Sequence, residues 1–166
     1  MPNYLSLFQN KQLVAARNLV IANQLIALND EIAEHGITLS QVDCKDIAEF
    51  RHEALTECER IEVGLGAAGR IVKEFADSGY VDKYNFRQVV EDLLECFYTL
   101  KNETEDKASD DQVMGFLHYL FEDVVGGDTS KLYDTQELDD FVSYMRGDKK
   151  RYNMGYSRKN KDNLED

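Results

Sequence analysis

Apolar residues recur at helical spacing along most of this chain. The first stripe steps by 7, 4, 3 and 4 and comprises Val14, Ile21, Leu25, Leu28 and Ile32. This spacing places all five on one face of a helix, which we predict from about Lys11 to His35. Gly36 follows and is expected to close that helix, since glycine readily adopts the left-handed conformation at a helix end.

A second helix is predicted after Ser40. Ser40 and Asp43 have the spacing of a capping box, in which each side chain binds the other residue's backbone N–H. The apolar stripe of this helix comprises Ile47, Phe50, Ala54, Cys58 and Ile61. We expect the helix to end between Glu59 and Val63.

Four further helices follow from the same periodicity. A third is predicted from Leu65 to Ala76, ending at Gly79, and a longer, strongly buried fourth from Phe86 to Leu100. The last two have N-terminal signals and apolar stripes of their own. In the fifth helix, Ser109 and Gln112 form a capping-box pattern before the stripe from Val113 to Val124, and Gly126 and Gly127 are the stop signal. In the sixth, Asp134 and Glu137 mark the start before the stripe from Leu138 to Met145.

These elements define an all-α fold. The only proline is Pro2, so no residue inside the chain forbids a long helix, and no repeat of fixed period indicates a solenoid. With 166 residues, 43% of them hydrophobic, the chain can bury a sizeable core. We predict a compact bundle of five to seven helices in residues 1–146, followed by a flexible basic tail in residues 147–166.

Charge is distributed unevenly. The net charge is −13, yet residues 146–161 carry seven basic residues against Asp148 alone. The candidate interaction residues of this tail are Lys149, Lys150, Arg151, Tyr152, Tyr156, Arg158, Lys159 and Lys161. Such a mixture can contact phosphates and stack on bases, or bind an acidic protein surface. The alternative is a disordered, solubilising terminus, either extended or folded back on the acidic body. The negative charge of that body disfavours duplex binding by the helical domain itself.

Four segments carry a resemblance to a known family. They are FRHEALTECERIEVGLG, EFADSGYVDKYNF, ECFYTLKNETED and ASDDQVMGFLHYLFED, in this order within residues 39–132. The chain resembles a family of small helical proteins of unknown function from anaerobic spore-forming bacteria. The resemblance implies a bacterial, intracellular protein without an established activity, and it assigns no functional residue.

A glycine motif suggests a dinucleotide site, but its context argues against one. Gly64, Gly66 and Gly69 have the GxGxxG spacing that lets a pyrophosphate approach a helix N-terminus. The preceding Arg60 to Val63 contains two charges, whereas a buried parallel strand is continuously apolar. We therefore interpret the motif as a glycine-rich connection between the second and third helices and predict no cofactor.

Two segments resemble metal-binding motifs but lack residues that such sites need. A calcium loop centred on Gly79 would put Asn85 where a bidentate carboxylate is required, so Phe75, Ala76 and Phe86 are better interpreted as core residues around a turn. Glu49 and His52 have the ExxH spacing of di-iron bundles. At 100° per residue, however, they lie about 140° and 160° from the apolar face and should face water.

The remaining histidines and the cysteines define no catalytic group. His118 has Gly115 where an ExxH motif needs glutamate, and His35 lies at a helix end. The three cysteines, Cys44, Cys58 and Cys96, form no CxxC pair, and their odd number argues against a disulfide framework. The apolar run from Leu19 to Leu28 is too short and too polar to span a membrane.

The sequence therefore predicts a bacterial cytoplasmic protein, most simply a non-catalytic protein-binding or regulatory module with an unidentified protein partner. The alternative is an enzyme with a pocket inside the helical bundle, for which no catalytic residue can be named. A third possibility is contact with nucleic acid through the tail.

Overall fold

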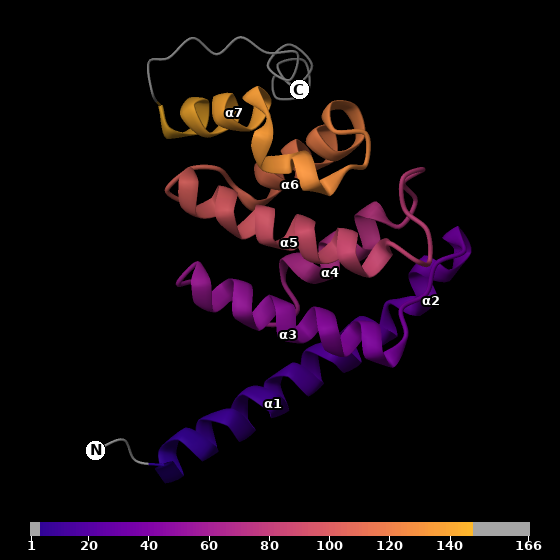
Figure 1. Ribbon diagram of the computed structural model, residues 1–166, viewed down its shortest axis with the longest axis vertical. Helices are drawn as coiled ribbons and strands as arrows, with labels where there is room; N and C mark the ends of the chain where they lie inside the picture. Colours follow the sequence, from indigo (N-terminus) through magenta and orange to yellow (C-terminus); the bar gives the residue numbers. More distant parts are fainter. Residues whose placement is uncertain (1–3, 148–166) are drawn as a thin grey trace. The chain divides into compact units, whose positions relative to one another are not determined.

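The computed structural model describes residues 4–147, and within this range the protein is all-α, as the sequence predicts. Seven α-helices are present among these residues, and no strand. They are α1 (Tyr4–Ala27), α2 (Asn29–Ile32), α3 (Gln41–Glu57), α4 (Ala67–Phe75), α5 (Phe86–Glu103), α6 (Asp110–Tyr119) and α7 (Gln136–Arg146) (Figure 1). Short 3₁₀ turns span Ala33–His35 and Thr129–Asp134, and a π-helical turn spans Leu120–Val124.

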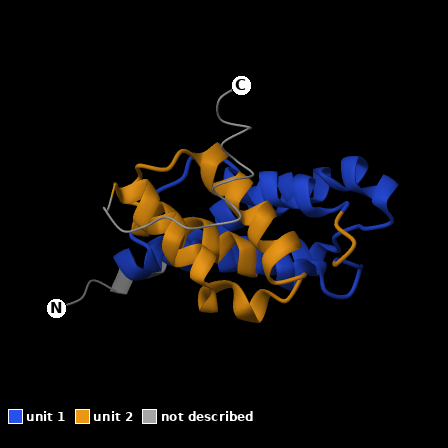
Figure 2. Ribbon diagram, turned by 90° about the horizontal axis from the view of Figure 1, so that it is seen from above, with its two compact units in different colours: residues 1–77, 81–91 blue, residues 78–80, 92–166 orange. Residues whose placement is uncertain are grey.

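The chain divides into two compact units (Figure 2). Within the described residues, unit 1 contains residues 4–77 and 81–91, and unit 2 contains residues 78–80 and 92–147. In unit 1, α1 packs against α3, and α2 contacts α4. In unit 2, α7 packs against the turns on either side of residue 125, Leu120–Val124 and Thr129–Asp134.

Helix α1 begins before and ends before the helix predicted from Lys11 to His35. Helix α1 already begins at Tyr4 and ends at Ala27, after which α2 and a 3₁₀ turn continue to Gly36. The carboxamide of Asn29 explains the break, because its Oδ1 accepts from the N–H of Leu39 at 2.7 Å and its Nδ2 donates to the Leu39 carbonyl at 2.8 Å. Gly36 closes the segment with φ +76°, as predicted.

The capping box of the second predicted helix is confirmed, but its C-terminal end is not. Ser40 and Asp43 bind each other's backbone N–H at 3.0 and 3.1 Å. The helix stops at Glu57, since Glu59 adopts a left-handed φ of +54° and the N–H of Arg60 returns to the Leu55 carbonyl at 2.9 Å. Ile61, predicted to belong to the apolar stripe, is therefore outside the helix and 96% exposed.

The core of unit 2 is built from the predicted stripes of α5 and α6. Leu93, Leu94 and Leu100 of α5 are fully buried, and so are Phe116 and Leu117 of α6. The predicted capping box of α6 is also present, because Ser109 and Gln112 bind each other's backbone N–H.

Aromatic packing and a threonine cap define the last helix. Phe141 of α7 stacks on Phe116 with ring centroids 4.2 Å apart and an interplanar angle of 5°. The N-cap is Thr135, whose hydroxyl accepts from the Leu138 N–H at 3.3 Å. The predicted cap, Asp134, is wrong by one residue, because it ends the preceding 3₁₀ turn.

Candidate functional site

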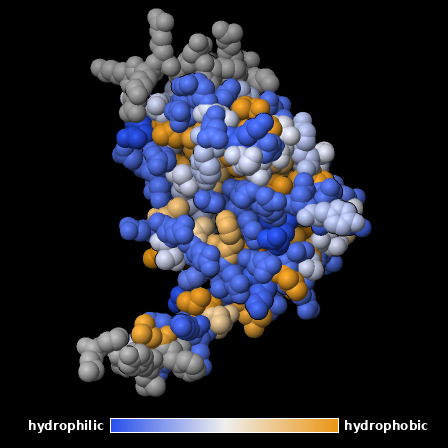
Figure 3. All heavy atoms as spheres, viewed as in Figure 1, coloured by the Kyte–Doolittle hydropathy of each residue, from blue (hydrophilic) through white to orange (hydrophobic). Residues whose placement is uncertain are grey.

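Helix α1 exposes apolar side chains on several sides. Leu7, Leu13, Leu19 and Val20 are each 50% to 62% exposed, whereas Ile21, Ala22 and Leu25 are buried. Figure 1 shows why, since the axes of α1 and α3 diverge toward the N-terminus of α1 and α3 covers only its C-terminal half. Hydrophobic surface is accordingly visible at this end of the protein in Figure 3. A helix with apolar side chains on more than one face normally packs against more than one neighbour.

The charge of α1 also differs from that of the rest of the chain. Its 24 residues include Lys11 and Arg17 but no aspartate or glutamate. Each of the other six described α-helices carries at least one carboxylate. In a chain with a net charge of −13, α1 is therefore the helix that an acidic surface can approach without carboxylate repulsion.

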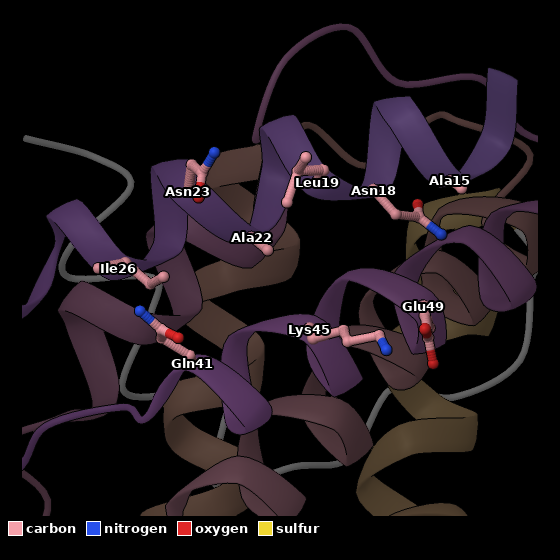
Figure 4. A pocket seen from close by; sticks show the side chains of 9 residues that line it. All are labelled: Ala15, Asn18, Leu19, Ala22, Asn23, Ile26, Gln41, Lys45 and Glu49. Carbon is pink, nitrogen blue, oxygen red and sulfur yellow. The ribbon is translucent and has the colours of Figure 1, made fainter. Parts of the chain in front are cut away.

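A groove of about 460 Å³ lies between α1 and α3 (Figure 4). Helix α3 contributes Gln41, Lys45 and Glu49, which occupy successive turns of one wall. Helix α1 contributes the other wall with Ala15, Asn18, Leu19, Ala22, Asn23 and Ile26. The surface is mainly apolar, with carboxamides and one pair of opposite charges at its edges.

The α1 wall contains a regular stripe of alternating size. Ala15, Leu19, Ala22 and Ile26 step by 4, 3 and 4, the heptad spacing of residues that pack against a second helix. Ala22 is buried at 6% exposure and Leu19 protrudes at 62%. This stripe is missed when a single apolar face is assigned to the helix, although its spacing and the absence of carboxylates can be read from the sequence.

A second exposed apolar feature is the connection from α3 to α4. Ile61 and Val63 are 96% and 94% exposed. Between them, Glu62 points inward, and its Oε1 lies 3.1 Å from the Nε of the buried Arg51. Arg51 also donates to the carbonyl oxygen of Gly64 at 2.6 Å. A buried cation thus fixes the backbone that presents two solvent-exposed side chains.

The GxGxxG segment has a structural explanation in this connection. Gly64 and Gly66 have φ values of +71° and +58°, which glycine adopts without strain. The second carboxylate oxygen of Glu62 accepts from the N–H of Ala67 at 3.2 Å and so binds the first residue of α4. A Cβ at Gly66 would overlap the Glu62 side chain. The interpretation as a connection between helices is confirmed, and Arg60 to Val63 form no strand.

The residues of the candidate metal motifs lie mainly where the sequence predicts them. Glu49 is exposed at the edge of the groove, as expected, whereas His52 is half-buried. Phe75, Ala76 and Phe86 are buried, which confirms them as core residues. Within the described part of the chain, no group of three or more His, Cys, Asp and Glu side chains is arranged to hold a metal ion.

The acidic residue near Gly79 serves the start of α5. Oδ1 of Asp82 accepts from the N–H groups of Tyr84 and Asn85 at 2.7 and 3.0 Å. Oδ1 of Asn85 in turn accepts from the Asp82 N–H at 2.7 Å. These reciprocal bonds satisfy backbone donors before Phe86, the first residue of the helix.

Two of the three cysteine thiols are suited to packing rather than to nucleophilic chemistry. Among the described residues the three cysteines form no disulfide, and Cys44 and Cys96 are completely buried. Burial, with a smaller contribution from the neighbouring Asp43, raises the pKa of Cys44 to about 11. Burial and the nearby Glu95 raise the pKa of Cys96 to about 12, against the lowering effect of a hydrogen bond with Tyr133. Neither thiol is ionised near neutral pH.

Unit 2 contains a second, more polar groove of about 560 Å³. Its lining includes Glu103 at the end of α5 and Asp139 and Asp140 of α7. The hydroxyl-bearing residues Thr99 and Ser143 belong to the same lining. The candidate interaction residues of the tail, between Lys149 and Lys161, lie outside the described residues.

The fold and the α1/α3 groove define an all-α protein with an incompletely covered apolar helix. The chain belongs to a family of unknown function (DUF6323), whose model matches residues 24–151. This match leaves out residues 4–23, which form most of α1. No curated protein and no solved structure matches the chain. Among the described helices, none has both the length and the apolar character needed to cross a membrane.

Proposed function

We propose that this chain is a non-catalytic protein-binding module of the bacterial cytoplasm, and that the α1/α3 groove is its contact surface. The observation that carries the proposal is the protruding apolar face of α1 beside a groove with a heptad-spaced wall. A helical segment that lies in an apolar groove is a common mode of protein recognition. The bound segment would bury Leu19 together with the groove wall and so remove apolar surface from water.

Charge supports a partner helix of particular composition. Lys11 and Arg17 are the only charged residues of α1, and the facing wall of α3 carries one cation, Lys45, and one carboxylate, Glu49. A partner helix with apolar residues at heptad spacing, and with acidic residues beyond its end, complements this surface. Cysteine thiols that form no disulfide within the described residues, together with the sequence resemblance given above, support a bacterial cytoplasmic setting.

Site-specific photo-crosslinking in cells tests the proposal. A photoreactive amino acid replaces Leu19 at the groove, and the matched control replaces Gln24, an exposed residue on the opposite side of α1. We expect a discrete crosslinked product from position 19 and none from position 24. The captured partner is then purified and titrated against the wild-type chain and against Leu19→Glu, which should weaken binding ~tenfold or more. Equal labelling from both positions, or unchanged affinity of Leu19→Glu, would contradict the proposal.

A further inference from the structure

The α1 stripe is complementary to a second copy of itself. Its four residues alternate small and large, with Ala15 and Ala22 between the larger Leu19 and Ile26. They are placed symmetrically about a point midway between Val20 and Ile21. If two α1 helices pack antiparallel about that point, Ala15 faces Ile26 of the other copy and Leu19 faces its Ala22. Every alanine then receives a large side chain, as close helix packing requires.

The exposure of these residues fits the same pairing. Leu19 protrudes at 62% exposure, while Ala22, its counterpart on the other copy, forms a recessed position at 6%. Because the two contacts are related by a two-fold axis, each copy offers one protruding leucine and one recess. This is the self-complementary arrangement of an isologous dimer.

Electrostatics favour α1 as the place where two acidic copies meet. The contact centres on α1, which has no carboxylate, and the α3 wall brings Glu49 together with Lys45 at its edge. In the antiparallel register, Lys11 of one copy lies just beyond the C-terminal end of α1 of the other, where α2 begins with the acidic residues Asp30 and Glu31. The antiparallel orientation also places the two helix dipoles in opposite directions, which is the favourable arrangement for neighbouring helices.

The size of the contact sets its expected strength. The stripe from Ala15 to Ile26 covers about 17 Å of helix, so a two-helix contact is smaller than the ~800 Å² per partner of a typical stable complex. The facing wall of α3 enlarges it through Lys45, Glu49 and Val42, which is 67% exposed on the same side of the helix. A reversible dimer follows from these dimensions.

We infer that the α1/α3 groove binds α1 of a second copy of this chain, forming an antiparallel two-fold dimer in which Leu19 packs on Ala22 of the other copy. This inference rests on the proposed function of the groove and names its occupant. Sedimentation velocity of the purified full chain over the micromolar concentration range tests it. The expected result is a monomer–dimer equilibrium.

Two neighbouring alanines provide the matched variants. Both Ala15 and Ala16 are exposed, but only Ala15 belongs to the stripe. Ala15→Leu fills the space for Ile26 of the other copy and should raise the dimer dissociation constant ~tenfold or more, as should Leu19→Glu. Ala16→Leu adds the same side chain outside the contact and should leave the constant within about twofold. Non-specific apolar association would instead be strengthened by both leucines. Circular dichroism of each variant checks that the helices are retained.

The outcomes separate this inference from the proposed function. A chain that stays monomeric over the whole range, or a dimer that Ala15→Leu does not weaken, overturns the second copy as occupant. A different protein crosslinked from position 19 would then still support the groove as a contact surface. A reversible dimer that Ala15→Leu weakens and Ala16→Leu does not supports both.

Discussion

Arg51 and Glu62 form an ion pair between α3 and the connection to α4, with Arg51 Nη2 3.1 Å from Glu62 Oε1. The side chains are only 8% and 19% exposed. Arg51 also donates to the Gly64 carbonyl, and Glu62 accepts from the first N–H of α4. Two residues eleven positions apart thus fix the whole connection.

Replacing Arg51 should destabilise the protein strongly. Arg51→Met removes the partner of a largely buried carboxylate and the donor to Gly64, so we expect the free energy of unfolding to fall by about 3 kcal/mol in urea denaturation. Arg70→Met, which breaks the half-exposed pair with Glu74, should cost less than ~1 kcal/mol. Equal losses from the two variants would show that Arg51 does not hold the connection.

Glycine at position 59 should stabilise the end of α3. Glu59 has φ +54°, a left-handed conformation that costs a residue with a Cβ about 1–2 kcal/mol. Glu59→Gly removes this cost but adds entropy to the unfolded chain, so a net gain of ~0.5 kcal/mol is expected from thermal or urea unfolding. Glu53→Gly, at an exposed interior position of the same helix, should instead cost about 1 kcal/mol. A loss of stability in Glu59→Gly would refute the assignment of strain.

Lys101 should contribute to the stability of unit 2 through its backbone contact more than through its ion pair. Its ammonium donates to the Ala108 carbonyl at 2.8 Å and lies 2.9 Å from the Asp110 carboxylate, which is 67% exposed. We expect Lys101→Met to lower the free energy of unfolding by about 1–2 kcal/mol and Asp110→Asn by less than ~1 kcal/mol. A larger loss of unfolding free energy in Asp110→Asn than in Lys101→Met would assign the larger role to the ion pair.

The three thiols should differ in their reaction with a disulfide reagent. Cys58 is half-buried, whereas Cys44 and Cys96 are fully buried. In native protein at neutral pH we expect one thiol to react and two to be protected until the chain unfolds. Cys58→Ala should abolish the native reaction. Rapid modification of all three without denaturant would contradict the buried positions.

Alkaline pH should destabilise the fold through the two buried thiols. Their pKa values are raised from 9.0 to about 11 for Cys44 and about 12 for Cys96, so the unfolded chain releases these protons first. Their contribution to stability is intact below pH 9 and is lost as the pH rises toward 11 and 12. The Cys44→Ala/Cys96→Ala variant should show a shallower decrease in the free energy of unfolding over this range. An identical slope in both proteins would exclude the thiols as its source.

Much of the fold was predictable because its signals are local. The capping boxes at Ser40 and Ser109 and the stripes of α5 and α6 use residues three or four positions apart, whose geometry the helix itself imposes. The errors arise where a distant residue intervenes. Asn29 binds Leu39 and interrupts the first helix.

The candidate site was predictable only in part. The stripe of Ala15, Leu19, Ala22 and Ile26 and the absence of carboxylates in α1 can be read from the sequence. Periodicity cannot tell which of two apolar faces finds an internal partner, because that depends on the direction in which α3 crosses α1.

The sequence by itself determined the all-α class and the helix starts at Ser40 and Ser109, because these depend on residues that are close together in the chain. It also determined the contrast between a basic, apolar α1 and an acidic chain, because this contrast is a matter of composition. Only the tertiary structure decided that Arg51 is buried against Glu62, that Ile61 faces solvent and that Leu19 borders an open groove. Burial is a property of the space between elements, and the spacing of residues along one element does not specify it.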